Sequence, residues 1–199
     1  MDDTYKTISH PSEALFKEKM SRFIAFALPV RNVDEVKSHL DKFQKEYYDA
    51  RHVCYAYMLG AERNEFRAND NGEPSGTAGK PILGQINSFD LTNILIVVVR
   101  YFGGVKLGTG GLAVAYREAA RLAIIENEII EKTVDEDISI VFEYPLLNEV
   151  MRIVKDENPE IIRQVFEMEC EMTLRIRKSS AEKLQTKLMK VDSVRITAH

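Results

Sequence analysis

The chain has 199 residues, of which 45% are hydrophobic and 29% charged, and its formal net charge is −4. This composition is typical of a globular protein and excludes a mainly disordered chain. The acidic balance argues against a generally basic nucleic-acid-binding protein, but it allows a local basic patch.

The length suffices for one large domain or two small ones. The only cysteines, Cys54 and Cys170, lie far apart without a CxxC pair, and the four histidines lack metal-ligand spacing, so neither a disulfide framework nor a metal site is expected. The first ten residues are acidic and polar, unlike a signal peptide, and the longest apolar run, residues 94–99, is too short to span a membrane. We therefore expect a cytoplasmic protein with no membrane partner and no cofactor.

The first part of the chain alternates between predicted strands and a helix. In chain order, we expect a polar lead-in (residues 1–11), a weak strand (13–20), a strong strand (21–30), a helix (33–47) and two further strands (52–59 and 65–68). Asn32 is a suitable N-cap for the helix, because its side chain can accept a hydrogen bond from the first turn. The pattern indicates a helix that covers a sheet.

Two glycine-rich loops follow, at residues 72–79 and 103–111, and they hold eight of the ten glycines. The strand between them, residues 94–99, has no polar alternation, so we expect both of its faces to be buried. Pro81 suits the first turn of a helix. The second loop leads into a helix at about residues 111–127, whose small face should pack closely on a sheet. That face consists of Ala115, Ala119, Ala120 and Ala123.

The character of the sequence changes near residue 131, beyond which there is no glycine. Apolar side chains alternate at residues 138–144, a helix follows at residues 147–154, and every even position from 166 to 176 is apolar, as in a strand with one exposed face. Ser179 and Glu182 have the spacing of a capping box for a further helix, and a short strand closes the chain. If a strand also begins at residue 161, the order is βαββαβ, a ferredoxin-like pattern.

The second glycine loop joins a strand to a helix, where free backbone N–H groups can hold a phosphate. Lys106 lies in the loop, with Arg100 and Arg117 on either side, and the segment from Lys80 to Arg121 has a local net charge of +3 from five basic and two acidic residues. These features favour an anionic ligand, such as a nucleotide or a nucleic-acid backbone. In the alternative interpretation the glycines only permit tight turns, and Arg100 pairs with a carboxylate.

Two better-defined phosphate-binding motifs match this sequence poorly. No Walker A string occurs, and the G-x-G-x-x-A match at Gly108, Gly110 and Ala113 does not follow directly after the strand, as a dinucleotide fingerprint requires. A Cys–His nucleophile from Cys54 and His52, two apart on one strand, lacks a third orienting group in the sequence, and whether this pair joins the site stays open.

The first loop also has two interpretations. Asp70 and Glu73 beside Ser75 and Thr77 resemble a catalytic carboxylate pair with hydroxyls. The same residue types next to glycine and proline also form turns and helix caps, which we favour.

The strings DNGEPSGTAGKPIL (70–83) and VVRYFGGVKLGTGGLAVAY (98–116) closely resemble the two signatures of the IMPACT/YigZ family. KMSRFIAFALPV (19–30) and RHVCYAY (51–57) extend the resemblance over about residues 5–130. It implies an α+β protein of two domains. Residues 1–131 would adopt an α/β sandwich like the second domain of a ribosomal small-subunit protein, and residues 132–199 a ferredoxin-like domain similar to the last domain of elongation factor G.

Both of those relatives contact ribosomal RNA, so the resemblance implies RNA or ribosome binding, with a link to translation regulation. The regulatory role of eukaryotic IMPACT proteins depends on an extra N-terminal domain, which we expect this chain to lack, so that role is not carried over. The sequence predicts no oligomeric state.

Our leading hypothesis is a non-catalytic RNA- or ribosome-associated protein in which basic side chains contact phosphates, aromatic rings stack and glycines let the backbone approach. The alternative is an enzyme or sensor that binds a phosphate or nucleotide, an anionic small ligand, between the two loops. The candidate binding residues are Arg51, Arg100, Tyr101, Phe102, Gly103, Gly104, Lys106, Gly108, Gly110, Gly111 and Arg117. The first loop adds Asp70, Glu73, Ser75, Thr77 and Lys80 as second candidates.

Overall fold

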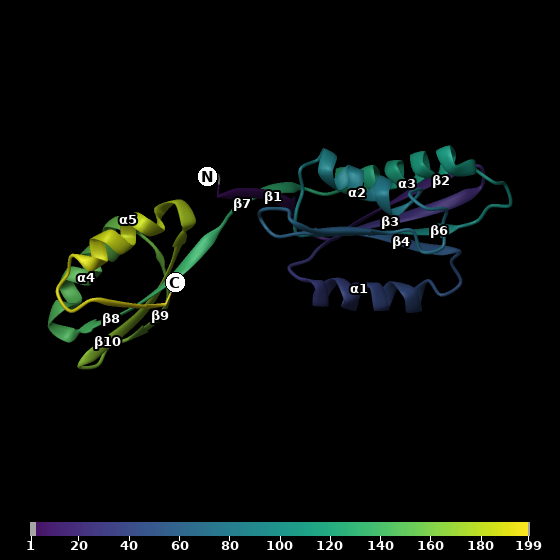
Figure 1. The fold of residues 1–199 in the computed structure, drawn as a ribbon. Helices are drawn as coiled ribbons and strands as arrows, with labels where there is room; N and C mark the ends of the chain where they lie inside the picture. Colours follow the sequence, from purple (N-terminus) through teal and green to yellow (C-terminus); the bar gives the residue numbers. More distant parts are fainter. Residues whose placement is uncertain (1–2, 199) are drawn as a thin grey trace. The chain divides into compact units, whose positions relative to one another are not determined.

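The computed structural model describes residues 3–198, and the chain forms two compact α+β units (Figure 1). The N-terminal unit comprises residues 5–132, and the C-terminal unit comprises residues 133–198 together with residues 3–4.

The N-terminal unit is built on a five-stranded antiparallel sheet with the strand order β2-β3-β6-β4-β5. Helices α2 and α3 cover one face of this sheet and α1 covers the other (Figure 1). In chain order its elements are β1 (Thr4–Ile8), β2 (Ser12–Glu18), β3 (Ser21–Pro29), α1 (Val33–Glu46), β4 (His52–Leu59), β5 (Glu65–Asn69), α2 (Gly79–Ser88), β6 (Ile94–Tyr101), α3 (Gly108–Ile125) and β7 (Ile129–Thr133).

Strand β6 is the centre of this unit. It pairs with β3 on one side and β4 on the other, and every side chain from Ile94 to Val99 has no exposed area. The prediction of a strand buried on both faces is therefore confirmed, because helices pack on both faces of the sheet. The four alanines of α3 named above are also fully buried, as expected for a helix that lies close to a sheet.

Several boundaries differ from the sequence prediction. The polar lead-in contains strand β1, which pairs with β7 and buries Ile8; residues 1–2 of that lead-in lie outside the described residues. Strand β2 ends earlier than expected, since Lys19 and Met20, both with positive φ, form the two-residue turn to β3. Helix α3 begins at Gly108 rather than Gly111, so three glycines lie in its first turn.

The C-terminal unit has the order βαββαβ, with an antiparallel sheet of strand order β11-β8-β10-β9. Its helices pack against the apolar side chains of the sheet. Its elements are β8 (Asp135–Glu143), a 3-10 turn (Tyr144–Leu146), α4 (Leu147–Glu157), β9 (Glu160–Val165), β10 (Glu169–Arg177), α5 (Lys178–Met189) and β11 (Arg195–Ala198).

Two predictions for this unit were wrong in detail. Phe166 and Met168 are 44% and 92% exposed, because β10 begins only at Glu169 and its buried side alternates from Cys170 onward. The capping box of Ser179 is absent, since α5 already begins at Lys178. Instead, the carboxylate of Asp3 accepts the backbone N–H of Ser179 at 2.9 Å. Its hydrogen bonds with Arg177 and Ser179 hold the pKa of Asp3 well below its ordinary value.

Candidate functional site

The two glycine-rich segments meet at one pocket beside the end of β6. The first loop (residues 70–78) joins β5 to α2, and the second loop (residues 102–107) joins β6 to α3. Between them lies a cavity of about 380 Å³, here called the loop pocket. It is lined by Arg51, His52, Glu73, Pro74, Arg100, Phe102, Lys106, Leu107, Gly108, Thr109 and Leu112.

The floor of the loop pocket is a buried ionic cluster. Glu73 and Arg100 are 7% and 6% exposed, and Nη1 of Arg100 lies 2.8 Å from each carboxylate oxygen of Glu73. The Nε2 atom of His52 lies 2.8 Å from Oε1 of Glu73, and its Nδ1 atom lies 2.7 Å from the backbone oxygen of Asn71. Glu73 therefore ties the first loop to the ends of β6 and β4. The interpretation in which Arg100 pairs with a carboxylate matches this geometry.

Two aromatic rings hold the Arg100 guanidinium. Its central carbon lies 5.6 Å from the ring centroid of Phe23 and 5.7 Å from that of Phe102. Among the described residues, its Nε atom is buried without a hydrogen-bond partner. This cation is buried, paired with Glu73 and within cation–π distance of both rings, so its charge is largely satisfied within the protein.

Asp70 organises the first loop from within. Its carboxylate accepts the backbone N–H groups of Gly76, Ala78 and Gly79 at 2.9, 3.1 and 2.9 Å. Burial of Asp70 opposes ionisation, but these three donors outweigh it and hold its pKa below the ordinary value. Thr77 donates its hydroxyl to the backbone oxygen of Pro74 at 2.6 Å. The side chains of Asp70 and Thr77 are both engaged in loop structure, which matches the interpretation of these residues as turn and cap residues.

The second loop depends on two glycines for different reasons. A Cβ atom at Gly103 would lie 2.0 Å from the backbone of Met20, so only glycine fits beneath the β2–β3 turn. Gly108 has φ of +76° where the chain enters α3, a conformation that other residues rarely adopt. The first turn of this 18-residue helix thus lies in the pocket wall, where backbone N–H groups have no intrahelical partner.

The exposed edge of the pocket carries two further cations. Arg51 and Lys106 are both exposed, and the guanidinium carbon of Arg51 lies 5.6 Å from the ring centroid of Phe102. Phe102 itself is 43% exposed. Cations, a ring and a helix N-terminus therefore surround one cavity, and these are groups that bind phosphates and flat rings.

Comparison with protein families identifies the segment that holds this pocket. Residues 19–124 match the family model described as the Impact N-terminal domain. The chain belongs to the IMPACT family. Every residue that lines the loop pocket lies within the matched segment.

Individual IMPACT relatives match over most of the chain. An IMPACT family member of Haemophilus influenzae is 33% identical over 192 residues, which cover 93% of this chain and 92% of the relative. The IMPACT family member YigZ of Escherichia coli is 34% identical over 151 residues, which cover 75% and 74%. A crystal structure described only as that of a hypothetical protein is 28% identical and aligns over 100% of this chain and 98% of its own, with a TM-score of 0.76.

In this IMPACT family member, Cys54 is buried and is not among the residues that line the pocket. Its sulfur contacts the hydroxyl of Tyr116 at 3.4 Å and the backbone oxygen of Asp70 at 3.1 Å. Burial raises the pKa of the Cys54 thiol to about 12, so the thiolate required for nucleophilic attack is scarce at neutral pH. His52 lines the pocket, but its ring nitrogens face Asn71 and Glu73, so the Cys–His nucleophile is not assembled.

The structure separates some of the other predicted residues from the pocket. Tyr101 packs against the opposite face of the sheet, where its hydroxyl donates to Asp49 at 2.9 Å. Three further candidates are exposed but lie outside the pocket lining, namely Ser75, Lys80 and Arg117. Gly104, Gly110 and Gly111 shape the loop and the first turn of α3.

The sequence reasoning missed four lining residues, which are Pro74, Leu107, Thr109 and Leu112. Leu107 and Leu112 are two apolar residues within a glycine-rich segment, and this pattern could have predicted an apolar wall of the pocket. Glycine and charge in that segment indicate an anion site, and neither points to an apolar wall.

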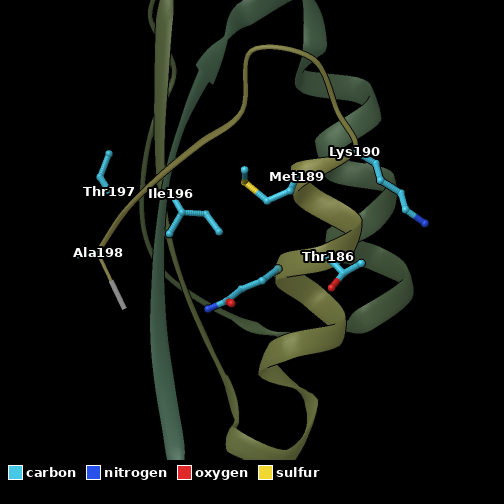
Figure 2. A pocket seen from close by; sticks show the side chains of 7 residues that line it. Thr186, Met189, Lys190, Ile196, Thr197 and Ala198 are labelled. Carbon is cyan, nitrogen blue, oxygen red and sulfur yellow. The ribbon is translucent and has the colours of Figure 1, made fainter.

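A larger hollow, of about 710 Å³, lies between α5 and β11 of the C-terminal unit (Figure 2). Met189 and Ile196 point into the gap between helix and strand, whereas Lys190 points away from it. In the part of the chain that the structure describes, Lys190 is the single charged side chain of its lining, so the hollow offers fewer anion-binding groups than the loop pocket. The loop pocket is therefore the better candidate site despite its smaller volume.

Residues 3–198 contain no helix long and apolar enough to cross a membrane. Within the same described stretch, no three His, Cys, Asp or Glu side chains gather as metal ligands would.

Proposed function

We propose that this IMPACT family member is a non-catalytic, cytoplasmic RNA-binding protein that holds RNA phosphate at the loop pocket, in association with the ribosome. The observation that carries the proposal is the grouping of Arg51, Lys106, Phe102 and the first turn of α3 around one cavity. Most protein contacts to nucleic acid go to phosphate and sugar, through basic side chains, backbone amides and helix N-termini. The link to translation regulation rests on the family resemblance.

The charges of the pocket divide into two sets. Arg100 is balanced by Glu73 at 2.8 Å, so it offers little net charge to a ligand. Arg51 and Lys106 are exposed, and the structure gives neither an ion pair within 4.0 Å in the described residues. The phosphate-facing charge we propose is therefore theirs, supplemented by the partial positive charge of the α3 N-terminus.

The absence of catalysis is part of the proposal, and it is supported by the state of the candidate groups. The thiol of Cys54 is buried with a raised pKa, and the carboxylate of Asp70 is occupied by three backbone donors. Neither is free to act as a nucleophile or a general base.

We further propose that the two compact units are separate domains. The βαββαβ order and the strand order of the C-terminal sheet support a ferredoxin-like fold for it. The resemblance of the N-terminal unit to a ribosomal-protein domain is an analogy at the level of the fold, and it supports contact with RNA only in that sense.

A second candidate function has one observation in its favour. The loop pocket has a volume of about 380 Å³, within the roughly 300–1,000 Å³ typical of small-molecule sites. A free phosphate-bearing ligand, such as a nucleotide, would then occupy it in an enzyme or sensor.

Binding of a labelled single-stranded RNA, measured by fluorescence anisotropy between about 50 and 300 mM salt, tests the proposal. Arg51→Ala combined with Lys106→Ala should weaken binding and reduce the slope of log K against log salt by about 1 to 2, because two phosphate contacts are lost. Lys80→Ala combined with Arg117→Ala is the matched control, since it removes the same charge from exposed residues outside the pocket lining. Equal effects of the two double variants, or no binding of RNA by the parent protein, would refute the proposal. Saturable binding of a mononucleotide without binding of RNA would favour the second candidate.

A further inference from the structure

We infer that the loop pocket takes one nucleobase of a single-stranded RNA, while Arg51 and Lys106 hold the adjoining phosphate at its exposed edge. This inference rests on the RNA binding proposed above and adds a base-binding role to it. A phosphate site alone would bind the backbone with no requirement for bases.

The first argument is the size and lining of the cavity. Its volume of about 380 Å³ exceeds the need of a single phosphate group and reaches the range of sites for whole organic ligands. Leu107, Leu112, Pro74 and the ring of Phe102 contribute apolar surface to it. Apolar walls disfavour a bare anion but suit a flat ring, whose faces are apolar and whose edges are polar.

The second argument is the pairing of Arg100 in the buried floor. The Arg100 cation and the Glu73 carboxylate lie 2.8 Å apart and are both nearly fully buried. Glu73 offsets the charge of Arg100, so this guanidinium offers little net charge to a phosphate. Among the described residues, the pocket cations without an ion pair are the two exposed side chains, Arg51 and Lys106. Charge is therefore placed at the edge of the pocket and apolar surface within it, which matches a nucleotide that enters base first.

The third argument is a stacking surface. Phe102 is 43% exposed and lines the pocket, and the guanidinium carbons of Arg51 and Arg100 lie 5.6 and 5.7 Å from its ring centroid. Unstacked RNA bases are commonly held on aromatic rings and on guanidinium planes, and both are present here on adjoining residues of the lining. A double-stranded RNA would not supply such a base, so the ligand is single-stranded.

The test compares two fluorescent oligomers of about ten nucleotides, oligoadenylate and an all-abasic ribose-phosphate chain with the same number of phosphates, at one fixed salt concentration. The parent protein should bind oligoadenylate at least about fivefold more tightly, the lower end of what stacking of one base contributes. Thr109→Phe, which fills the pocket from an exposed lining position, should abolish this preference.

Two further variants complete the design. Phe102→Leu removes the stacking ring from an exposed position and should also reduce the preference. Ser75→Phe adds the same bulk as Thr109→Phe at an exposed first-loop residue outside the lining, and the preference should persist.

The possible failures are distinguishable. If the abasic chain binds as tightly as oligoadenylate, and the dependence on Arg51 and Lys106 remains, the base-binding inference is overturned and the proposed RNA binding stands. A preference for bases that survives both pocket variants also overturns it. If neither oligomer binds, the inference and the proposed function fail together.

Discussion

The buried pair of Glu73 and Arg100 permits a quantitative test of how the loops are held. We consider Glu73→Gln, which keeps the volume but removes the charge, and Arg100→Met, which keeps the aliphatic length but removes the cation. Both residues are less than 10% exposed, and the carboxylate interacts with Arg100 and His52, each at 2.8 Å. Removing one partner of a buried ion pair typically costs about 3–5 kcal/mol, because the other charge remains buried without compensation.

We take the lower end of that range, since Glu73 lies in a loop, and loops open locally at a lower free energy than core elements. Each single variant should therefore lower the free energy of unfolding by ~3 kcal/mol, which corresponds to a fall of roughly 10 °C in Tm for a unit of this size. The double variant should cost less than either single variant, because the second change removes the charge that the first left buried without compensation.

The assay is urea unfolding followed by tyrosine fluorescence. The chain has no tryptophan, and all of its eight tyrosines except Tyr144 lie in residues 5–132, so the signal reports mainly on the N-terminal unit. Arg31→Met is the control, because it breaks the ion pair of an 86% exposed arginine with Glu35 and should cost less than about 1 kcal/mol. Additive costs in the double variant, or single variants no worse than Arg31→Met, would show that the buried pair does not hold the loops.

Three other predictions follow from the same loops. Cys54 should resist alkylation at pH 8 in the folded protein and react readily in urea, because burial raises its pKa to about 12. The alkylation rates are measured by mass spectrometry. Comparable rates in the folded and unfolded states would contradict this. Asp70→Asn should lower the free energy of unfolding at pH 7. The difference from the parent should shrink as the pH falls through the lowered folded-state pKa of Asp70, because the ionised carboxylate is what stabilises the loop. A difference that is constant with pH would argue against this. Gly103→Ala should destabilise the protein by at least about 1–3 kcal/mol, because the added Cβ would overlap the backbone of Met20. Gly110→Ala adds a Cβ with nothing within 4 Å, so it should be neutral or stabilise by up to about 1 kcal/mol. Thermal unfolding checks this, and a Tm of Gly103→Ala that is not below that of Gly110→Ala would contradict it.

Much of the fold was predictable because hydrophobic period and cap chemistry are local. The N-cap at Asn32 is confirmed, as its side-chain oxygen accepts the N–H of Glu35 at 2.9 Å. The buried run of β6 and the alanine face of α3 are confirmed as well. Strand β1 and the cap of α5 were missed, because each depends on a partner more than 100 residues away in the chain: β1 pairs with β7, and Asp3 caps α5.

The candidate site shows the same division. The sequence indicated two glycine loops, a central strand and a set of cations, and the family resemblance made that assignment specific. It left open whether Arg100 faces a ligand or a carboxylate, since a charge has no preferred partner until the chain is folded. It also grouped Tyr101 with Phe102, although adjacent residues at the end of a strand point to opposite faces of the sheet.

The sequence by itself determined the α+β class, the position of most elements and the segment that carries the site, because apolar period, glycine and proline act over a few residues. Only the tertiary structure decided that the two loops share one pocket, that Glu73 neutralises Arg100, and that Arg51 and Lys106 are the cations left exposed beside it. The physical reason is that burial and charge pairing depend on long-range contacts. Here these contacts join β4, β6 and two loops that are separated in the sequence.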